Sequence, residues 1–201
     1  MTSYALFHLK LKAGDKLFAL LSSFSNYKII AIVACFMLLF GSIAYQVVQA
    51  RPPSEYQLKA AFLYNVARMV KWPKADRKKP LIVCLMGEDP FGDALSSIKK
   101  KKVKKRRLEF KMDISIRDIP QCNVLFVTQA AQDLLTNILP SVENQHILTV
   151  GDVPEFATQG GMVNLLKNGE RIAIEINLKV VKASNIVISS RLLTLAKIVD
   201  E

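Results

Sequence analysis

The stretch Ile147–Leu193 constrains the fold most, because it contains several short structural elements in direct succession. A short apolar strand, Ile147–Val150, opens it, and Asp152 is placed just after this strand to cap a few helical residues. Gly160 and Gly161 then supply the positive-φ freedom that ends such a helix and turns the chain. We therefore expect a strand, a helical segment and a tight turn within this first part of the stretch.

A hairpin and a short helix are predicted after the two glycines. The apolar run Met162–Leu166 leads into Asn168 and Gly169, which form the strongest short hairpin signal in the chain. Beyond this turn isoleucines alternate with other residues, which predicts a half-buried strand with Glu175 on the face opposite the isoleucines. Asn177 is placed to cap a short helix that follows. The hairpin predicts antiparallel strands in this part of the sheet.

Helices and apolar strands alternate along the chain before this stretch. The spacing of Ser54 and Gln57 matches a capping box, so a helix is predicted from Glu55 to Trp72-Pro73. Helices that separate apolar strands indicate βαβ crossovers and a largely parallel sheet. We predict an α/β fold: a single compact domain whose mixed, mostly parallel sheet of about six strands is flanked by helices. The further predicted elements are strands at Leu81–Met86, Leu108–Ile116 and Asn123–Val127, helices at about Phe91–Ile98 and Ala130–Leu139, and a last helix after Ser189 or Ser190 that includes Val199.

An apolar segment near the N-terminus predicts export from the cytoplasm. Ile29–Tyr45 is almost entirely apolar, follows a lysine-rich region, and leads into the small-residue pattern Val48-Gln49-Ala50. This order is typical of a cleaved signal peptide. An uncleaved membrane anchor is the alternative, since about 20 apolar residues span a bilayer. We expect a signal peptide or anchor in residues 1–50 and one α/β domain in residues 51–201, placed outside the cytoplasm by the preceding lysines.

The first predicted helix and the C-terminal stretch together resemble a known family. In these residues the chain is similar to the YfiR-type family of small periplasmic proteins, over about Ser54–Val199. The residues that carry the resemblance, called the signature residues below, are EYQLKAAFLYNVARMVKWP at Glu55–Pro73, GD at Gly151-Asp152, Phe156, GGMVN at Gly160–Asn164, EIN at Glu175–Asn177 and ISSRLL at Ile188–Leu193.

The resemblance implies a location and a function. It implies a periplasmic regulator without catalytic activity that binds the periplasmic part of an inner-membrane signalling protein. The best-known member represses a diguanylate cyclase, so this chain is expected to restrain cyclic-di-GMP signalling. A periplasmic binding module for a small molecule or an anionic envelope polymer is the alternative, and an accessory subunit of an envelope complex is another. Whether the chain forms a homodimer stays open.

Two cysteines lie outside the N-terminal apolar segment. Cys84 and Cys122 each lie at or next to a predicted strand. In an exported protein an even pair of cysteines is more often bridged than free. Members of the YfiR-type family have similarly placed cysteines, so the resemblance also favours a Cys84–Cys122 disulfide. Two buried thiols that act as small apolar side chains are the alternative.

Positive charge is concentrated in one segment. Residues 51–201 contain 24 Lys and Arg against 16 Asp and Glu, and the run Lys99–Arg107 alone holds eight basic residues. This run departs from the family pattern, in which the loop is shorter. A solvated loop is the ordinary interpretation. The functional one is contact with phospholipid headgroups, acidic envelope polymer or an acidic partner, whereas nucleic acid is disfavoured because no aromatic residues interleave. The predicted contact residues are Lys99, Lys100, Lys101, Lys102, Lys104, Lys105, Arg106 and Arg107.

Sequence patterns of enzymes are missing. No G-x-S-x-G surrounds a serine, and no glycine-rich loop precedes Lys-Ser or Lys-Thr. His146 is the single histidine after residue 50, which leaves no zinc-type spacing. We therefore expect no enzymatic activity, no metal and no cofactor.

Further contact residues are taken from the signature. Glu175 is either a solvent-facing residue on an outer strand or lies on the rim of a ligand or partner pocket with Ser189 and Arg191. The segment Phe156–Asn164 is expected to give the contact surface its shape, with Phe156 as a contact residue. Structural roles at turns or caps are assigned to Gly151, Asp152, Gly160, Gly161 and Asn177.

Overall fold

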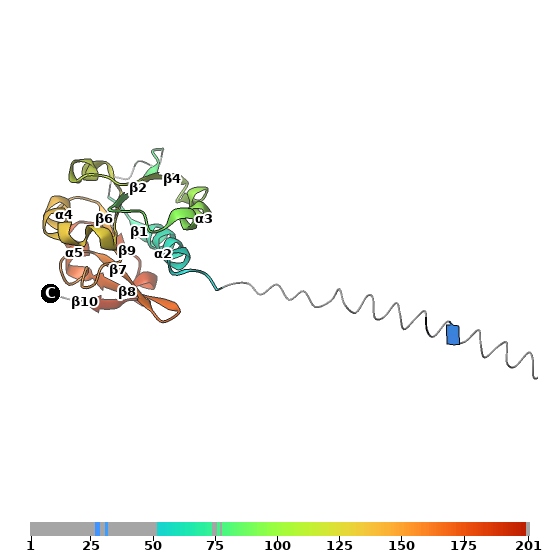
Figure 1. Ribbon diagram of the computed structural model, residues 1–201. Coiled ribbons are helices and arrows are strands. Elements are labelled where there is room, and N and C mark those ends of the chain that lie inside the picture. Colours follow the sequence, from blue (N-terminus) through green and yellow to red (C-terminus); the bar gives the residue numbers. More distant parts are fainter. Residues whose placement is uncertain (1–26, 29–30, 32–51, 74–75, 77, 200–201) are drawn as a thin grey trace, which may run out of the picture. The chain divides into compact units, whose positions relative to one another are not determined.

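The computed structural model describes residues 27–28, 31, 52–73, 76 and 78–199 (Figure 1). The chain divides into two compact units, residues 1–51 and 52–201, and the α/β fold lies in the second. The predicted signal peptide or anchor falls almost entirely outside the described residues. Within the described part of the chain, no helix has the length and apolar character needed to cross a membrane.

An eight-stranded mixed sheet forms the centre of the second unit. Strands β4, β2, β5, β6 and β7 run parallel, β8 is antiparallel to β7, β10 is parallel to β8, and β3 is antiparallel to β4. The predicted mixed, mostly parallel sheet is confirmed. In spatial order the strands are β10 (Lys197–Val199), β8 (Arg171–Asn177), β7 (Val163–Asn168), β6 (Leu148–Gly151), β5 (Val124–Val127), β2 (Leu81–Met86), β4 (Arg106–Lys111) and β3 (Lys102–Val103).

Helices flank this sheet, and a small second sheet pairs two short strands. The helix α2 (Glu55–Met69) begins at the predicted capping box, in which the Ser54 Oγ accepts from the Gln57 N–H and the Gln57 Oε1 accepts from the Ser54 N–H. The remaining elements are η1 (Gly92–Leu95), α3 (Ser96–Lys99), η2 (Ile116–Gln121), η3 (Gln129–Leu134), α4 (Leu135–Val142), α5 (Leu178–Ala183), α6 (Ser190–Leu193), and the strands β1 (Val70–Lys71) and β9 (Val187–Ile188), which pair antiparallel.

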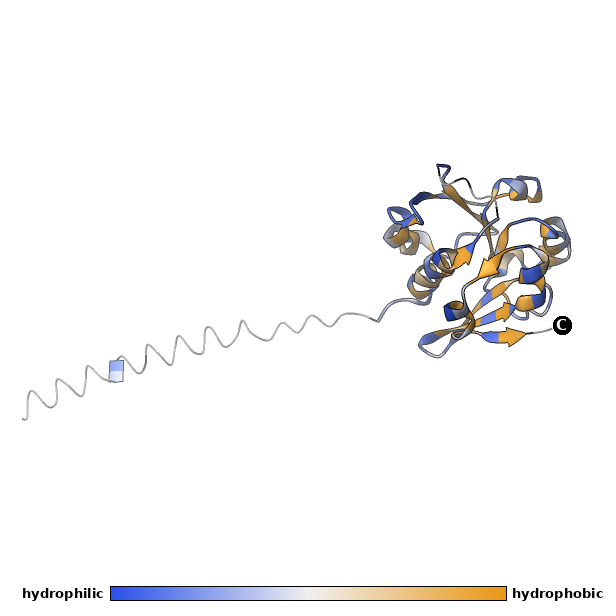
Figure 2. Ribbon diagram, turned by 180° about the vertical axis from the view of Figure 1, so that it is seen from behind, coloured by the Kyte–Doolittle hydropathy of each residue, from blue (hydrophilic) through white to orange (hydrophobic). Residues whose placement is uncertain are grey.

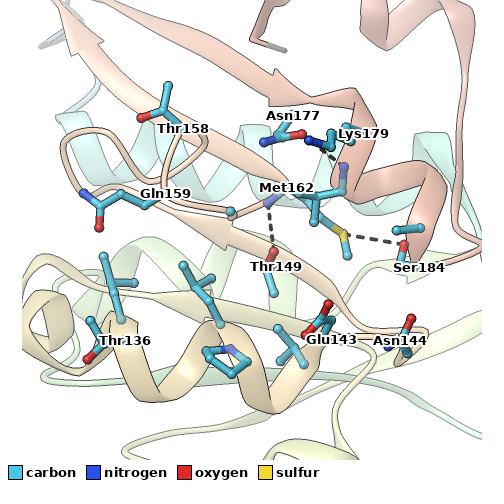
Figure 3. Close-up of a pocket in the computed structure, with 17 residues that line it drawn as sticks. Thr136, Glu143, Asn144, Thr149, Thr158, Gln159, Met162, Asn177, Lys179 and Ser184 are labelled. Atoms are coloured by element: carbon cyan, nitrogen blue, oxygen red, sulfur yellow. Dashed lines mark hydrogen bonds between the residues drawn. The ribbon is translucent and has the colours of Figure 1, made fainter. Parts of the chain in front are cut away.

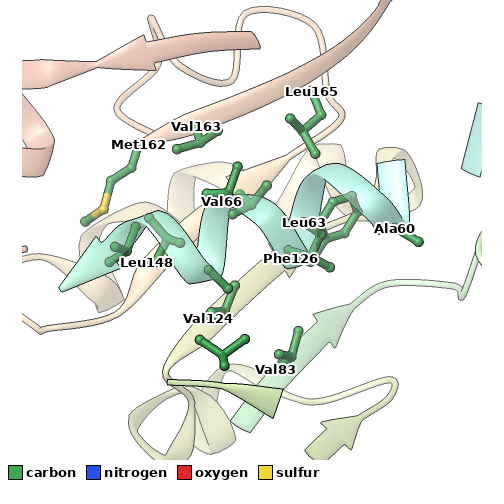
Figure 4. Packing of buried hydrophobic residues seen from close by; sticks show 14 of the residues in the cluster. Ala60, Leu63, Val66, Val83, Val124, Phe126, Leu148, Met162, Val163 and Leu165 are labelled. Carbon is green, nitrogen blue, oxygen red and sulfur yellow. The ribbon is translucent and has the colours of Figure 1, made fainter. Parts of the chain in front are cut away.

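Alternate residues of the central strands enter two different apolar clusters. Val83, Val124 and Phe126 point toward α2, where they pack with Leu63 and Val66 (Figure 4). The residues that alternate with them in these strands belong to a second cluster, which packs with α4. This cluster includes Cys84, Met86, Leu125 and Val127 of the strands and Ile138 of α4. Burial on both faces explains why the strand sequences are continuous apolar runs. Figure 2 shows the hydrophobic residues concentrated in these strands.

Several predicted elements differ from the structure. The strand predicted at Leu108–Ile116 ends at Lys111, and Ile116 instead begins η2. The first helix ends at Met69 instead of Trp72-Pro73, because Val70 pairs with Ile188 in the small sheet. The last helix ends at Leu193, and Lys197–Val199 instead forms β10 against β8. Two strands beyond the predicted six, β3 and β10, therefore come from segments that were expected to be loop and helix.

The segment after β6 is another difference. Residues 153–160 form consecutive turns instead of the short helix that was expected. The turns are closed by backbone hydrogen bonds such as the one from the Phe156 N–H to the Val153 C=O. This segment crosses from β6 to the parallel strand β7 without a regular helix.

Candidate interaction surface

The basic run Lys99–Arg107 is not a solvated loop. It finishes α3, forms β3, turns at Lys104 and Lys105, and enters β4 at Arg106. Arg106 is buried, and its guanidinium donates to the Lys79 C=O at 2.9 Å and to the Asn123 Oδ1 at 2.9 Å. Burial lowers the pKa of the guanidinium from its ordinary value. The predicted contact role of Arg106 is therefore wrong: this residue holds the hairpin to the chain that precedes β2.

The hairpin also packs on the C-terminal half of α2. The Tyr64 hydroxyl donates to the Lys102 C=O at 3.2 Å. The Lys101 ammonium lies 5.0 Å from the centre of the Tyr64 ring, and the Arg68 guanidinium lies 5.5 Å from it. The Lys104 ammonium donates to the Val70 C=O at the end of α2. These contacts bring the basic run next to the basic residues at the helix exit.

One surface therefore combines basic residues from two segments that are separate in sequence. Its members are all exposed, and exposed carboxylates on the same segments are those of Asp76 and Glu109. This set is called the basic surface below and comprises Arg68, Lys71, Lys78, Lys79, Lys99, Lys100, Lys101, Lys102, Lys105 and Arg107.

A buried aromatic ring explains the glycines of the signature. Phe156 is fully buried, and a Cβ atom built on Gly151 would lie 2.6 Å from its Cγ. A Cβ atom on Gly161 would lie 2.2 Å from the Phe156 Cε1. The ring thus packs directly on the backbone of both glycines, and only Gly160 of the pair has a positive φ, at 108°. Phe156 is a core residue, so its predicted role as a contact residue is wrong.

Asp152 has a different role from the predicted helix cap. Its Oδ2 accepts from the Lys59 ammonium and the Tyr56 hydroxyl, each at 3.0 Å, and Lys59 also pairs with Glu55 at 2.6 Å. Lys59 and Asp152 are both buried, whereas Glu55 is half-buried. The hydrogen bond from Lys59 lowers the pKa of Glu55. Desolvation raises the pKa of Tyr56, so its hydroxyl remains a donor.

Two asparagines of the signature fix the segment between β6 and β7. The Asn177 Oδ1 accepts from the Val180 N–H at 3.0 Å, which confirms the predicted cap of α5. The Asn177 Nδ2 donates to the Ala157 C=O at 2.9 Å, and the Asn164 Nδ2 donates to the Val153 C=O at 2.8 Å. Both side chains are buried. They satisfy backbone carbonyls that regular secondary structure would otherwise satisfy.

Glu175, Ser189 and Arg191, predicted to share a pocket rim, have separate contacts in the structure. Glu175 pairs with Lys197 of the neighbouring strand at 3.1 Å. The Ser189 N–H donates to the Met69 C=O at 2.9 Å, while Arg191 is exposed on α6. No hydrogen bond or ion pair joins Glu175 to Ser189 or Arg191 among the residues that the structure describes.

A pocket of about 740 Å³ lies elsewhere, between α4, the segment 158–162 and α5 (Figure 3). Its walls include Leu139, Met162 and Val180, and Glu143 and Lys179 are exposed residues of its lining. Of the predicted site residues, only Gly160 and Asn177 contribute to it. Sequence reasoning missed this pocket, because it is assembled from three segments that carry no shared pattern.

Cys84 and Cys122 form a disulfide, as predicted. Their Cα atoms are 5.9 Å apart, and the bridge joins residues 38 positions apart within the second apolar cluster. Over the described ranges, no group of three or more His, Cys, Asp or Glu side chains could hold a metal ion.

Solved structures of two other proteins are similar to this chain. One is described as the ABC domain in complex with L-Trp from Streptococcus pneumonia, with a TM-score of 0.49 and 11% identity over 72% of this chain. The other is a conserved domain protein from Vibrio cholerae, with a TM-score of 0.46 and 11% identity over 73% of this chain. This chain spans 60% of the length of each. No curated protein matches it.

A family model also matches this chain. The model described as YfiR/HmsC-like covers residues 56–197. This range contains α2 from its second residue onward, seven complete strands of the eight-stranded sheet and the first residue of β10. It also contains every signature segment after Glu55. The resemblance inferred from the signature residues is confirmed. The chain belongs to the YfiR/HmsC-like family, a family of periplasmic regulators of diguanylate cyclases.

Proposed function

We propose that this protein is a non-enzymatic periplasmic regulator that binds the periplasmic part of an inner-membrane diguanylate cyclase and represses it. Family membership over residues 56–197 is the observation that carries this proposal. The disulfide supports an oxidising compartment such as the periplasm. A rigid, bridged scaffold that offers a binding surface is sufficient for such a role, since repression by binding requires no chemistry of its own.

The regulator acts as an allosteric ligand of its receptor. Binding more tightly to the inactive state of the cyclase shifts the receptor population toward that state. A shift from almost fully active to almost fully inactive requires a difference in affinity of about 10⁴-fold between the two states. The protein then changes the cytoplasmic output without crossing the membrane itself.

In-cell cross-linking followed by mass spectrometry tests the proposal. The expected captured partner is an inner-membrane protein with a cytoplasmic cyclase domain, and deletion of the regulator is expected to raise cyclic-di-GMP. Capture of a membrane partner together with a fall in cyclic-di-GMP on deletion would show that the protein activates the cyclase and would contradict repression. Capture of only lipid or envelope polymer would contradict the proposal.

The pocket favours a second candidate function, a binding module for a small molecule. Its volume of about 740 Å³ and its largely apolar walls with a few polar groups are typical of ligand sites. A saturable rise in melting temperature with one compound, abolished by Ala183→Trp at the pocket wall, would support this function. A matched Ala61→Trp change, at an exposed position of α2, should leave the rise intact. An anionic envelope polymer is the other ligand considered for such a module.

A further inference from the structure

We infer that the basic surface binds anionic phospholipid headgroups and thereby places the domain on the membrane that holds its partner. This inference shares the periplasmic location with the proposed function, but it does not depend on the identity of the partner. The surface was defined above by ten exposed cations on α2, its exit loop, α3 and the β3–β4 hairpin.

The first argument is that the tertiary structure joins two basic segments. Tyr64 contacts both Arg68 of its own helix and Lys101 of the hairpin region. At the other end of the hairpin, the Arg106 guanidinium donates to the Lys79 C=O, which holds Lys79 beside β4. Residues about thirty positions apart therefore present their charge together, as an extended anionic surface requires.

The second argument is that no ion pair among the described residues involves these cations. The ion pairs of the described residues are those of Lys59 with Glu55 and Asp152, Lys167 with Glu55, and Lys197 with Glu175. None of them includes a residue of the basic surface. Repulsion among so many neighbouring cations opposes folding, so an external anion that neutralises them binds favourably.

The third argument is the backbone of the hairpin turn. Lys104 and Lys105 form a two-residue connection with φ values of 50° and 74°. This left-handed conformation favours Asn-Gly, and lysine adopts it at a cost in stability. The choice of lysine at position 104 is explained by the hydrogen bond from its ammonium to the Val70 C=O. The Lys105 side chain, in contrast, is exposed at the tip of the turn. A strained lysine at an exposed tip indicates that its charge serves a purpose outside the domain.

Protection of the sheet edge explains only part of this pattern. Lysines on an edge strand discourage pairing with other chains, and β3 is an edge strand. That explanation accounts for Lys102, but not for Lys99 and Lys100 on and after α3, or for Arg68 and Lys71 at the end of α2. The charge continues well beyond the edge that needs protection.

Lipid headgroups fit the chemistry better than a defined acidic protein site. Eight of the ten cations are lysines, which act as mobile point charges, whereas specific carboxylate recognition favours the rigid fork of arginine. None of the ten lines the pocket between α4 and α5. Attraction to a charged membrane accumulates with each nearby cation and needs no fixed geometry.

Vesicle co-sedimentation of the purified exported protein tests this inference. Vesicles of phosphatidylcholine containing about one third phosphatidylglycerol should sediment the protein, and pure phosphatidylcholine vesicles should not. Raising the salt from about 0.1 M to about 1 M should release it, because the Debye length falls from about 10 Å to about 3 Å. Equal binding to both vesicles would overturn the inference.

A charge-matched pair of variants locates the site. The variant Lys99→Gln, Lys100→Gln, Lys102→Gln should bind the anionic vesicles on the order of a hundredfold more weakly. The control Arg117→Gln, Arg171→Gln, Lys182→Gln removes the same charge from exposed positions elsewhere and should bind like the wild type. Equal losses in both variants would show that total charge, not this surface, drives binding, and would also overturn the inference.

The proposed function can fail separately. If cross-linking in cells captures a cyclase but the wild-type protein ignores anionic vesicles, the basic surface belongs to an acidic protein contact and the lipid inference is wrong. If vesicles bind and no membrane protein is captured, the lipid inference stands and the regulator proposal is wrong. Circular dichroism of both variants establishes that each is folded.

Discussion

The Lys59 ammonium lies 3.0 Å from the Asp152 Oδ2, although the two residues are 93 positions apart in the chain. Both are buried, and both belong to signature segments, Lys59 to the first and Asp152 to a later one. The pair therefore ties α2 to the carboxyl end of β6. Buried ion pairs contribute little net stability, but loss of one partner leaves an uncompensated charge.

We predict that Lys59→Met lowers the free energy of unfolding by about 3–5 kcal/mol, because the Asp152 carboxylate then lies buried without its cation. Denaturant unfolding measures this loss. The double variant Lys59→Met, Asp152→Asn should recover more than half of it, since the asparagine oxygen can still accept from the Tyr56 hydroxyl. A single variant as stable as the wild type would show that the pair is not buried in solution.

Steric contact, not backbone conformation, makes Gly161 necessary. Gly161→Ala places a Cβ atom against the Phe156 ring and should lower the free energy of unfolding by about 1–3 kcal/mol. Adding Phe156→Leu should reduce this cost by making room. In the control Gly169→Ala, no atom lies within 4 Å of the new Cβ. Only the backbone strain at a φ of 60° should therefore lower its free energy of unfolding. Additive effects of Gly161→Ala and Phe156→Leu would contradict the packing.

Reduction of the Cys84–Cys122 disulfide should lower stability. The bridge closes a loop of 38 residues, which corresponds to about 4 kcal/mol in the chain-entropy model. The melting temperature measured with and without reductant checks this value, and the Cys84→Ala, Cys122→Ala double variant should be insensitive to reductant. An unchanged melting temperature in the wild type would mean that the bridge does not form or does not contribute.

Glu55 should make stability depend on pH in the acid range. Its folded-state pKa lies below the ordinary value of 4.5, chiefly because of the Lys59 hydrogen bond. The unfolded state therefore binds the proton more readily, so the stabilisation is complete above about pH 4.5 and is lost as the pH falls through the folded pKa. Unfolding from about pH 6 to about pH 3 should show a smaller loss in Glu55→Gln. Parallel pH profiles of the two proteins would refute this assignment.

The strained hairpin turn predicts opposite effects on stability and binding. Lys105→Gly removes the cost of a φ of 74° and should raise the free energy of unfolding by about 1 kcal/mol. The same change removes one cation from the basic surface and should weaken binding to anionic vesicles by a few-fold. Chemical denaturation and co-sedimentation measure the two effects. A stabilised variant that binds vesicles as tightly as the wild type would show that Lys105 does not contribute to lipid binding.

Much of the architecture was predictable, because it follows from local pattern. The boundaries of β2 come directly from an apolar run, and the start of α2 comes from the capping box at Ser54. Alternating isoleucines gave β8, and Asn168-Gly169 gave the hairpin before it. The family signature and the disulfide partners could also be identified in the sequence. The strands, helix start and hairpin depend on residues close together in the chain or on a pattern that repeats along it, and the disulfide follows from two cysteines in an exported domain.

The basic run and the end of the chain could not be assigned in this way. Local charge was compatible with either a solvated loop or a contact surface over Lys99–Arg107, yet Arg106 is buried because carbonyl groups of the chain before β2 and the Asn123 side chain accept its hydrogen bonds. The short strand β10 forms only because β8 offers it an edge to pair with. Hydrogen-bond partners that come from distant segments leave no mark on local periodicity.

The sequence by itself determined the α/β class, the position of most strands, the family and the cysteine pair, because side-chain pattern dictates which face of each element is buried. The tertiary structure decided the roles of individual signature residues. Phe156 became core because two glycine backbones approach it, and Asp152 became an ion-pair partner because α2 brings Lys59 to it. It also decided that two basic segments form one surface, since only folding places the hairpin beside the exit of α2.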